Sequence, residues 1–124
     1  MKMLKAVVVE PREKARIEEI DATLSSLQKI VGGTIQVIYP YTDEVALICN
    51  DNGKIEGLPL NRALVDGEGK IYDIIAGTFV IVGLDDCDFG PLSESLAQKY
   101  LQRFRKWEKF CRIGGQIIAI PMDK

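Results

Sequence analysis

The chain has 124 residues and a mass of 13.8 kDa, a length that predicts one domain. A chain of this mass can bury roughly two-thirds of its unfolded surface, which is enough for a hydrophobic core without disulfides. With 47% hydrophobic and 27% charged residues, the composition excludes a disordered, collagen-like or membrane-embedded chain. Sixteen basic and 18 acidic residues leave a formal charge of −2, which argues against nucleic acid as a partner but leaves room for a local basic patch.

The sequence contains no histidine. This removes Ser-His-Asp and Cys-His arrangements, the usual general base and the commonest zinc ligand. The cysteines Cys49, Cys87 and Cys111 show no Cys-x-x-Cys spacing, so they predict neither a disulfide framework nor a zinc site. We expect Cys49 to be buried in its apolar run, and Cys87 to be a poor nucleophile because acids surround it. No metal, cofactor or catalytic residue is expected.

The N-terminal run MKMLKAVVVEPREK passes from a short apolar stretch directly into charge. It lacks the apolar core of a signal peptide, and no stretch approaches the roughly 20 apolar residues of a membrane span. Together with free thiols, this predicts a cytoplasmic protein without a membrane segment.

The first half of the chain is expected to contain strands and one helix. Strands are predicted at 4–10, 16–20, 34–39 and 45–49, with a short return strand at 54–57 after the turn at 50–53. Asp21 or Thr23 can cap a helix that reaches about Lys29. Gly32 can then end this helix in a left-handed conformation.

The second half begins with a predicted short helical turn at 58–64, entered through Pro59. Strands are expected at 71–75 and 78–82, and an acidic loop at 85–90. Ser93 can cap the longest helix, predicted from Glu94 to about Phe110. The apolar run at 116–120 is expected to be a strand that either closes the sheet or is exchanged with a second chain.

This order predicts an α+β fold in a single domain over 1–124, with a core at about 4–110 and a C-terminal strand or tail at 114–124. We expect a mainly antiparallel mixed sheet with two helices packed on one face and a short helical turn near residue 60.

Four residues are the candidates for ligand binding. Asn61 and Arg62 offer an amide beside a guanidinium fork, which suits an anion or a carboxylate at a helix start. Tyr72 and Asp73 follow closely and can line the same pocket. The competing interpretation is structural, with Asn61 bound to local backbone and Arg62 paired with a surface acid.

Two charged segments are further candidate sites. Asp85, Asp86 and Asp88 do not have the alternating acids of a calcium loop, so a solvated loop is expected. The end of the last predicted helix is basic and interleaved with aromatic residues, which makes it a candidate contact for nucleic-acid phosphates. Its basic residues are Arg103, Arg105, Lys106 and Lys109. Positive charge there also stabilises a helix C-terminus by roughly 0.3–1 kcal/mol without any ligand.

The segments KAVVVEP, LQKIVGG, ICNDNGKIEGLPLNRAL and IYDIIAGTFVIVG, with Asp88-Phe89 after them, have a recognisable pattern. From Leu4 to about Phe89 the chain resembles the family known as domain of unknown function 3846. Its members look like small proteins of Gram-positive bacteria, their phages and mobile elements. The resemblance implies no activity, and it does not extend to the GGQIIAIPMDK tail.

Three hypotheses of function follow. The first is a small non-catalytic protein of a phage or mobile element that binds a host macromolecule or a small anionic ligand, as a monomer or a homodimer. The second is a hydrolase in which Asp73 acts as the base, since a carboxylate can do so without histidine. The third is a nucleic-acid-binding accessory protein that uses the basic end of the last helix.

Overall fold

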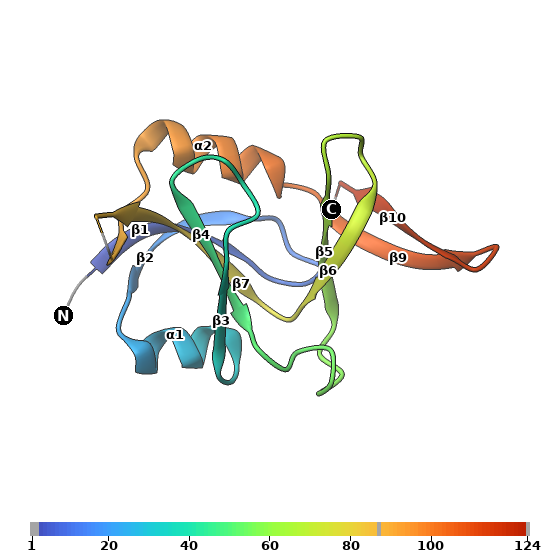
Figure 1. Ribbon diagram of the computed structural model, residues 1–124, viewed down its shortest axis with the longest axis horizontal. Coiled ribbons are helices and arrows are strands. Elements are labelled where there is room, and N and C mark those ends of the chain that lie inside the picture. The colour runs from blue at the N-terminus through green and yellow to red at the C-terminus, as the bar shows by residue number, and fades with distance from the viewer. Residues whose placement is uncertain (1–2, 87, 124) are drawn as a thin grey trace.

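The computed structural model describes residues 3–86 and 88–123 (Figure 1). The described helices are α1 (Leu24–Val31) and α2 (Glu94–Arg103). The described strands are β1 (Met3–Val9), β2 (Arg16–Asp21), β3 (Ile35–Ile38), β4 (Val45–Asn50), β5 (Leu60–Val65), β6 (Ile71–Ala76), β7 (Phe79–Asp85), β8 (Asp88–Gly90), β9 (Trp107–Ile113) and β10 (Gln116–Met122). The α+β class is confirmed: one domain with mostly antiparallel sheets and two helices in its described part.

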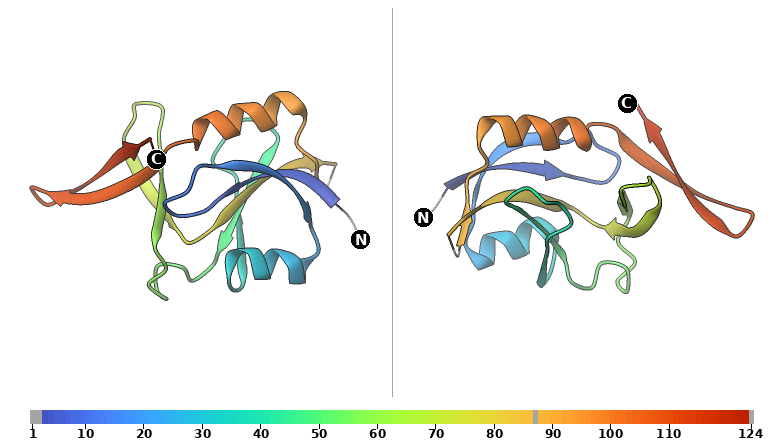
Figure 2. Two further views of the ribbon diagram at one scale, coloured as in Figure 1. Left: turned by 180° about the vertical axis from the view of Figure 1, so that it is seen from behind. Right: turned by 45° about the horizontal axis from the view of Figure 1, so that its top comes forward.

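Within the described residues, six strands form the main sheet, in the order β2-β1-β7-β4-β3, with β8 added on β7. All of its pairs are antiparallel. Two hairpins, β5–β6 and β9–β10, form separate two-stranded sheets. Figure 2 shows that β9–β10 projects from the body of the molecule.

The central strands contain continuous apolar runs, at 6–9, 45–49 and 79–82, because both of their faces are buried there. Side chains alternate between the two faces of a strand, so each of these strands feeds two cores. One core lies between the sheet and α2, and includes Val7, Val9, Val45, Leu47, Phe79, Ile81, Ala97, Tyr100 and Phe104. The other lies between the sheet and α1, and includes Ala6, Val8, Ala46, Ile48, Val80, Val82, Leu27 and Val31.

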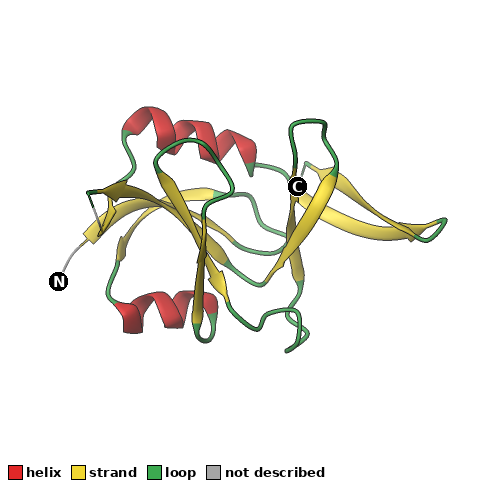
Figure 3. Cartoon of the chain, in the orientation of Figure 1, coloured by secondary structure: helices red, strands yellow, loops and turns green. Residues whose placement is uncertain are grey.

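The two helices therefore cover opposite faces of the main sheet (Figures 1 and 3). The expectation that both would pack on one face is wrong. Apolar runs without alternation, such as 45–49, carry this information, because a sheet with one solvated face would show polar residues at every second position.

Helix α1 has the predicted ends. The Thr23 hydroxyl accepts a hydrogen bond from the Ser26 amide at 3.4 Å, which caps the N-terminus. Gly32 has φ of 82° and donates its amide to the Gln28 carbonyl, which ends the helix.

Helix α2 begins after Ser93 as predicted, but it ends at Arg103 rather than near Phe110. Residues 107–113 form β9, which pairs with β10 across a two-residue turn. Gly114 and Gly115 have φ of 60° and 80°, values that suit the tight turn of a hairpin. The C-terminal strand is confirmed, but its partner is β9 and not the main sheet.

The short helical turn predicted near residue 60 is wrong, because Leu60–Val65 is strand β5 and pairs with β6. Residues 54–57 form turns instead of a return strand. Part of the predicted acidic loop is β8, at Asp88–Gly90. Cys87, and the expectation about its thiol, lie outside the described residues.

Candidate functional site

A β-bulge in β5 turns Asn61 and Arg62 into the protein. Leu60 pairs with Ala76 and Arg62 pairs with Ile75, so Asn61 is an extra residue on its strand. Adjacent residues of a regular strand would face opposite sides. Here both side chains are buried, with exposed fractions of 0% and 1%.

The guanidinium of Arg62 is saturated by the protein itself. It has five N–H donors. Nε and Nη2 donate to the carbonyl of Phe104 at 3.3 and 2.7 Å, and Nη2 also donates to the carbonyl of Glu13 at 2.7 Å. Nη1 donates to the carbonyl of Glu10 at 3.5 Å and to Oδ1 of Asn61 at 2.9 Å. No donor of this side chain remains for a ligand.

The amide of Asn61 is used in the same way. Its Nδ2 donates to the carbonyl of Val9 at 2.9 Å and to the carbonyl of Gly77 at 2.8 Å. The Asn61–Arg62 pair thus ties β5 to the β1–β2 connection, to the β6–β7 turn and to the end of α2. The structural interpretation expected Asn61 to bond to backbone groups, and it does so. It also expected Arg62 to pair with a surface acid, but the partners of Arg62 are mainly backbone carbonyl groups.

The buried charge of Arg62 is balanced mainly by these carbonyl dipoles. Burial lowers the pKa of Arg62 to about 10, and the Glu108 carboxylate acts in the opposite direction. The guanidinium therefore stays protonated at neutral pH. Phe104 is the C-cap of α2, where the helix dipole places partial negative charge that favours a cation.

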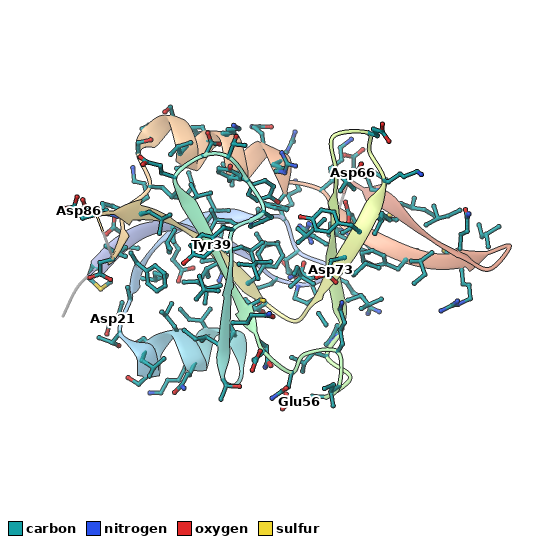
Figure 4. The ribbon with its side chains drawn as sticks, viewed as in Figure 1. Asp21, Tyr39, Glu56, Asp66, Asp73 and Asp86 are labelled. Atoms are coloured by element: carbon teal, nitrogen blue, oxygen red, sulfur yellow. The ribbon has the colours of Figure 1, made fainter. Side chains whose placement is uncertain are left out.

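Tyr72 and Asp73 lie elsewhere. Tyr72 is 56% exposed on β6. Asp73 forms an ion pair with Lys54 and accepts a hydrogen bond from the Ile74 amide at 2.8 Å. Figure 4 shows Asp73 on β6 and Asp66 at the far turn of the same hairpin. Asn61 and Arg62 are thus buried, whereas Tyr72 is exposed and Asp73 is partly exposed beside Lys54.

A groove with a volume of about 1040 Å³ lies between the β5–β6 and β9–β10 hairpins. Tyr72 and Asp73 line it, but Asn61 and Arg62 do not. Its apolar lining comes from Leu60, Ala63, Val65, Ile71, Ile74, Ile117, Ile118 and Ala119. Its charged lining comes from Lys54, Lys70, Asp73, Glu108 and Arg112.

Glu108 joins the two hairpins at the base of this groove. Its Oε1 accepts a hydrogen bond from the Ala63 amide at 2.8 Å. Burial raises the pKa of Glu108, while the Ala63 amide and the Arg62 charge act to lower it. The sequence prediction of a helix to about Phe110 misses the β9–β10 hairpin, which brings Glu108, Arg112 and Ile117 to the groove. The available signal was the Gly114-Gly115 pair between two strand-like runs, which is typical of a hairpin.

The basic candidates do not share a helix. Arg103 ends α2 and lies over the ring of Tyr41, 4.4 Å from its centroid. Arg105 and Lys106 are in the connection to β9, and Lys106 pairs with Asp123 at 3.5 Å. Lys109 is on β9. The basic, aromatic end of one helix that the sequence predicts is therefore divided between α2, a connection and β9.

Metal sites and membrane-spanning helices can be considered over residues 3–86 and 88–123. No group of three or more His, Cys, Asp or Glu side chains there is placed to hold a metal ion. No helix in this part of the chain is long and apolar enough to cross a membrane.

The chain matches the family described as Domain of unknown function (DUF3846) over residues 1–105, and it belongs to that family. No curated protein and no solved structure matches it. The family match covers the main sheet, both helices and the β5–β6 hairpin, and it ends before β9. One wall of the groove thus lies inside the matched region and the other lies outside it.

Proposed function

We propose that this protein is a non-catalytic binding protein, and that the groove between the two hairpins holds an extended segment of a partner protein. The proposal keeps the expectation of a cytoplasmic protein from a phage or mobile element that acts on a host macromolecule. The observation that carries it is the groove itself: an open, mainly apolar hollow whose walls are two antiparallel ribbons.

The apolar lining favours a partner with apolar side chains. Tyr72 is 56% exposed, Ile117 41% and Leu60 40%, so water covers a large part of these side chains in the free protein. Covering such surface stabilises a complex by roughly 25 cal/mol per Å² of apolar area, before the cost of ordering the partner.

The charges of the groove favour an acidic partner. Asp73 is paired with Lys54, and Glu108 accepts the Ala63 amide. The side chains of Lys70 and Arg112 form no hydrogen bond or ion pair with any described residue, although both line the groove. Two free cations beside apolar side chains suit a strand that alternates apolar and acidic residues.

The same observations rank the other hypotheses lower. A small anion would have to use Arg62, whose five donors are occupied, or the widely open groove. Asp73 is held by Lys54 and by the Ile74 amide, which lowers its value as a general base.

Two fluorescent eight-residue peptides test the proposal. In the first, Val and Ile alternate with Asp and Glu, and in the second the acids are replaced by Lys. Fluorescence anisotropy should show the acidic peptide binding about tenfold more tightly or better, because only it matches Lys70 and Arg112. The double variant Lys70→Glu/Arg112→Glu should reverse this preference, and Ile117→Asp should weaken binding of the acidic peptide.

Leu24→Asp is the matched control. Leu24 is 59% exposed on α1 and does not line the groove, so this variant should bind like the wild type. The proposal is wrong if neither peptide binds saturably. It is also wrong if the groove variants and the control bind both peptides equally well.

A further inference from the structure

Strand β10 has one unpaired edge. In the described structure it pairs with β9 and with no other strand. An isolated two-stranded hairpin is marginally stable in water, and three or more strands or packing on a further element are needed for independent stability. The hairpin contacts the rest of the chain mainly through β9 and β5, so most of β10 lacks such support.

Two isoleucines of β10 lie on the hairpin face opposite to that of Arg112 and Phe110. Residues 118 and 120 share this face with Cys111 and Lys109 of β9. Ile118 and Ile120 are each 39% exposed. Both side chains are therefore partly open to solvent.

The free edge of β10 also lacks the usual protection by charge. Natural edge strands are protected by charged side chains, by proline or by being short. The edge strand β2 carries Arg16, Glu18, Glu19 and Asp21, and the other edge, β3, has only four residues. By contrast, β10 contains no charged residue, and Pro121 is its only protective feature.

The hairpin register defines which backbone groups face outward. Across a two-residue turn, Ile113 and Gln116 form a hydrogen-bonded pair, and the pattern then alternates along the ladder. The backbone groups of Ile118 and Ile120 therefore form hydrogen bonds with β9. Ile117, Ala119 and Pro121 direct their backbone groups to the free edge, where Pro121 offers only a carbonyl.

We propose that β10 pairs with β10 of a second copy of this chain, antiparallel and centred on Ala119. Ala119 then exchanges two hydrogen bonds with its equivalent across the twofold axis. Ile117 donates to the carbonyl of the partner's Pro121, so the missing amide of proline causes no clash. Ile118 lies opposite the partner's Ile120, a β-branched cross-strand pair of the kind that stabilises sheets.

The self-pairing is specific because the strand is complementary to itself. Residues 116–122 contain no charged side chain, so no like charges face each other in this register. Pairing joins two marginal hairpins into one four-stranded antiparallel sheet, β9-β10-β10-β9. The pairing uses the free edge of β10 and the Ile118–Ile120 face. Ile118 also lines the groove, whereas Ile120 does not, and the pairing does not require that the groove binds a peptide.

Analytical ultracentrifugation of the full chain and its charge variants tests the proposal. The wild type should sediment as a dimer of the 13.8 kDa chain that dissociates on dilution. Ile118→Lys/Ile120→Lys should be monomeric, because each lysine faces a lysine of the partner. Ile118→Glu/Ile120→Glu should be monomeric for the same reason, and an equimolar mixture of the two variants should sediment as a heterodimer.

Ile113→Lys is the control, since Ile113 is 59% exposed near the hairpin turn and lies outside the proposed contact. It should remain dimeric, and circular dichroism should show the same spectrum for all variants. A monomeric wild type overturns the proposal, as does a dimer that persists in the double-lysine variant. Recovery of the mixed dimer excludes misfolding as the cause of dissociation. A dimeric wild type that binds neither peptide overturns the groove proposal alone, and a monomeric wild type that binds the acidic peptide overturns the dimer proposal alone.

Discussion

The guanidinium of Arg62 and the carbonyl oxygen of Phe104 are joined by two hydrogen bonds, from Nε at 3.3 Å and from Nη2 at 2.7 Å. The two residues are 42 positions apart in the chain. This contact fixes the end of α2 on β5 and sets the point from which β9 leaves the body of the protein. A buried arginine that is solvated by backbone carbonyls is thus a structural element of this fold.

Removing the Arg62 guanidinium should strongly destabilise the protein. Arg62→Met leaves the buried carbonyl of Phe104 without the Arg62 donors and removes the part-buried bond to the carbonyl of Glu13, and we expect a loss of about 3 kcal/mol in the free energy of unfolding. Arg62→Lys should recover only part of this loss, because an ammonium cannot reproduce the fork of five donors. Urea denaturation measures both.

Arg112→Met is the control for Arg62, because Arg112 is exposed on β9. It should change the free energy of unfolding by about 0.5 kcal/mol or less. Equal losses for the Arg62 and Arg112 variants would show that the carbonyl contacts of Arg62 contribute little to stability.

Asp43 should stabilise the fold at neutral pH and lose this effect as the pH falls. Its Oδ2 accepts hydrogen bonds from Nζ of Lys99 at 2.6 Å and from the Tyr100 hydroxyl at 2.7 Å. The Lys99 contact, followed by the Tyr100 contact, holds the pKa of Asp43 below its usual value. A carboxylate with a depressed folded-state pKa stabilises the fold above its unfolded pKa, and this contribution disappears as the pH falls through the folded-state value.

Asp43→Asn should therefore be less stable than the wild type at pH 7, and the difference should shrink as the pH falls below about 4. Thermal unfolding of both proteins across this pH range measures the difference. Asp66→Asn, at the far turn of the β5–β6 hairpin, serves to detect general effects of charge removal. A difference between wild type and Asp43→Asn that is constant with pH would contradict the assignment.

The parts of the fold that the sequence predicted are those where local signals and tertiary contacts agree. The β-branched run of β1, the Thr23 and Gly32 ends of α1 and the uninterrupted apolar run of β4 all have one interpretation. In these segments burial, capping and backbone preference favour the same conformation.

The failures occur where the tertiary contacts override the local pattern. Residues 58–64 carry Pro59 followed by helix-forming residues, yet β5 forms because pairing with β6 and the carbonyl contacts of Arg62 stabilise a bulged strand. Trp107 and Phe110 have helical spacing, but the Gly114-Gly115 turn pairs their segment with β10. The candidate site changed accordingly: Tyr72 and Asp73 line the groove, while Asn61 and Arg62 are structural.

Cys49 should react slowly with thiol reagents. It is 3% exposed, and burial raises its pKa to about 11, with the nearby carboxylates of Asp73 and Asp51 acting in the same direction. At pH 8 only about one thiol in a thousand would then be ionised, and the thiolate is the reactive form. In a Cys87→Ser background, iodoacetamide should modify the half-buried Cys111 first, as mass spectrometry of tryptic peptides would show. Modification of Cys49 at the rate of Cys111 would contradict the buried position of Cys49.

Glu108 should destabilise the fold in its ionised form. Its burial raises the folded-state pKa above the ordinary value of 4.5, although the Ala63 amide and Arg62 favour the carboxylate. A carboxyl group with a raised folded-state pKa stabilises the fold below its unfolded pKa, and this contribution is lost as the pH rises through the folded-state value.

Glu108→Gln keeps an oxygen that can accept the Ala63 amide but has no charge to bury. Relative to the wild type, the variant should therefore gain stability between pH 4 and pH 7, by about 1 kcal/mol or less. Urea denaturation of both proteins at the two pH values measures this gain. The exposed variant Glu68→Gln should show no such trend, and a Glu108→Gln variant that loses stability as the pH rises would show that the carboxylate is favoured at this position.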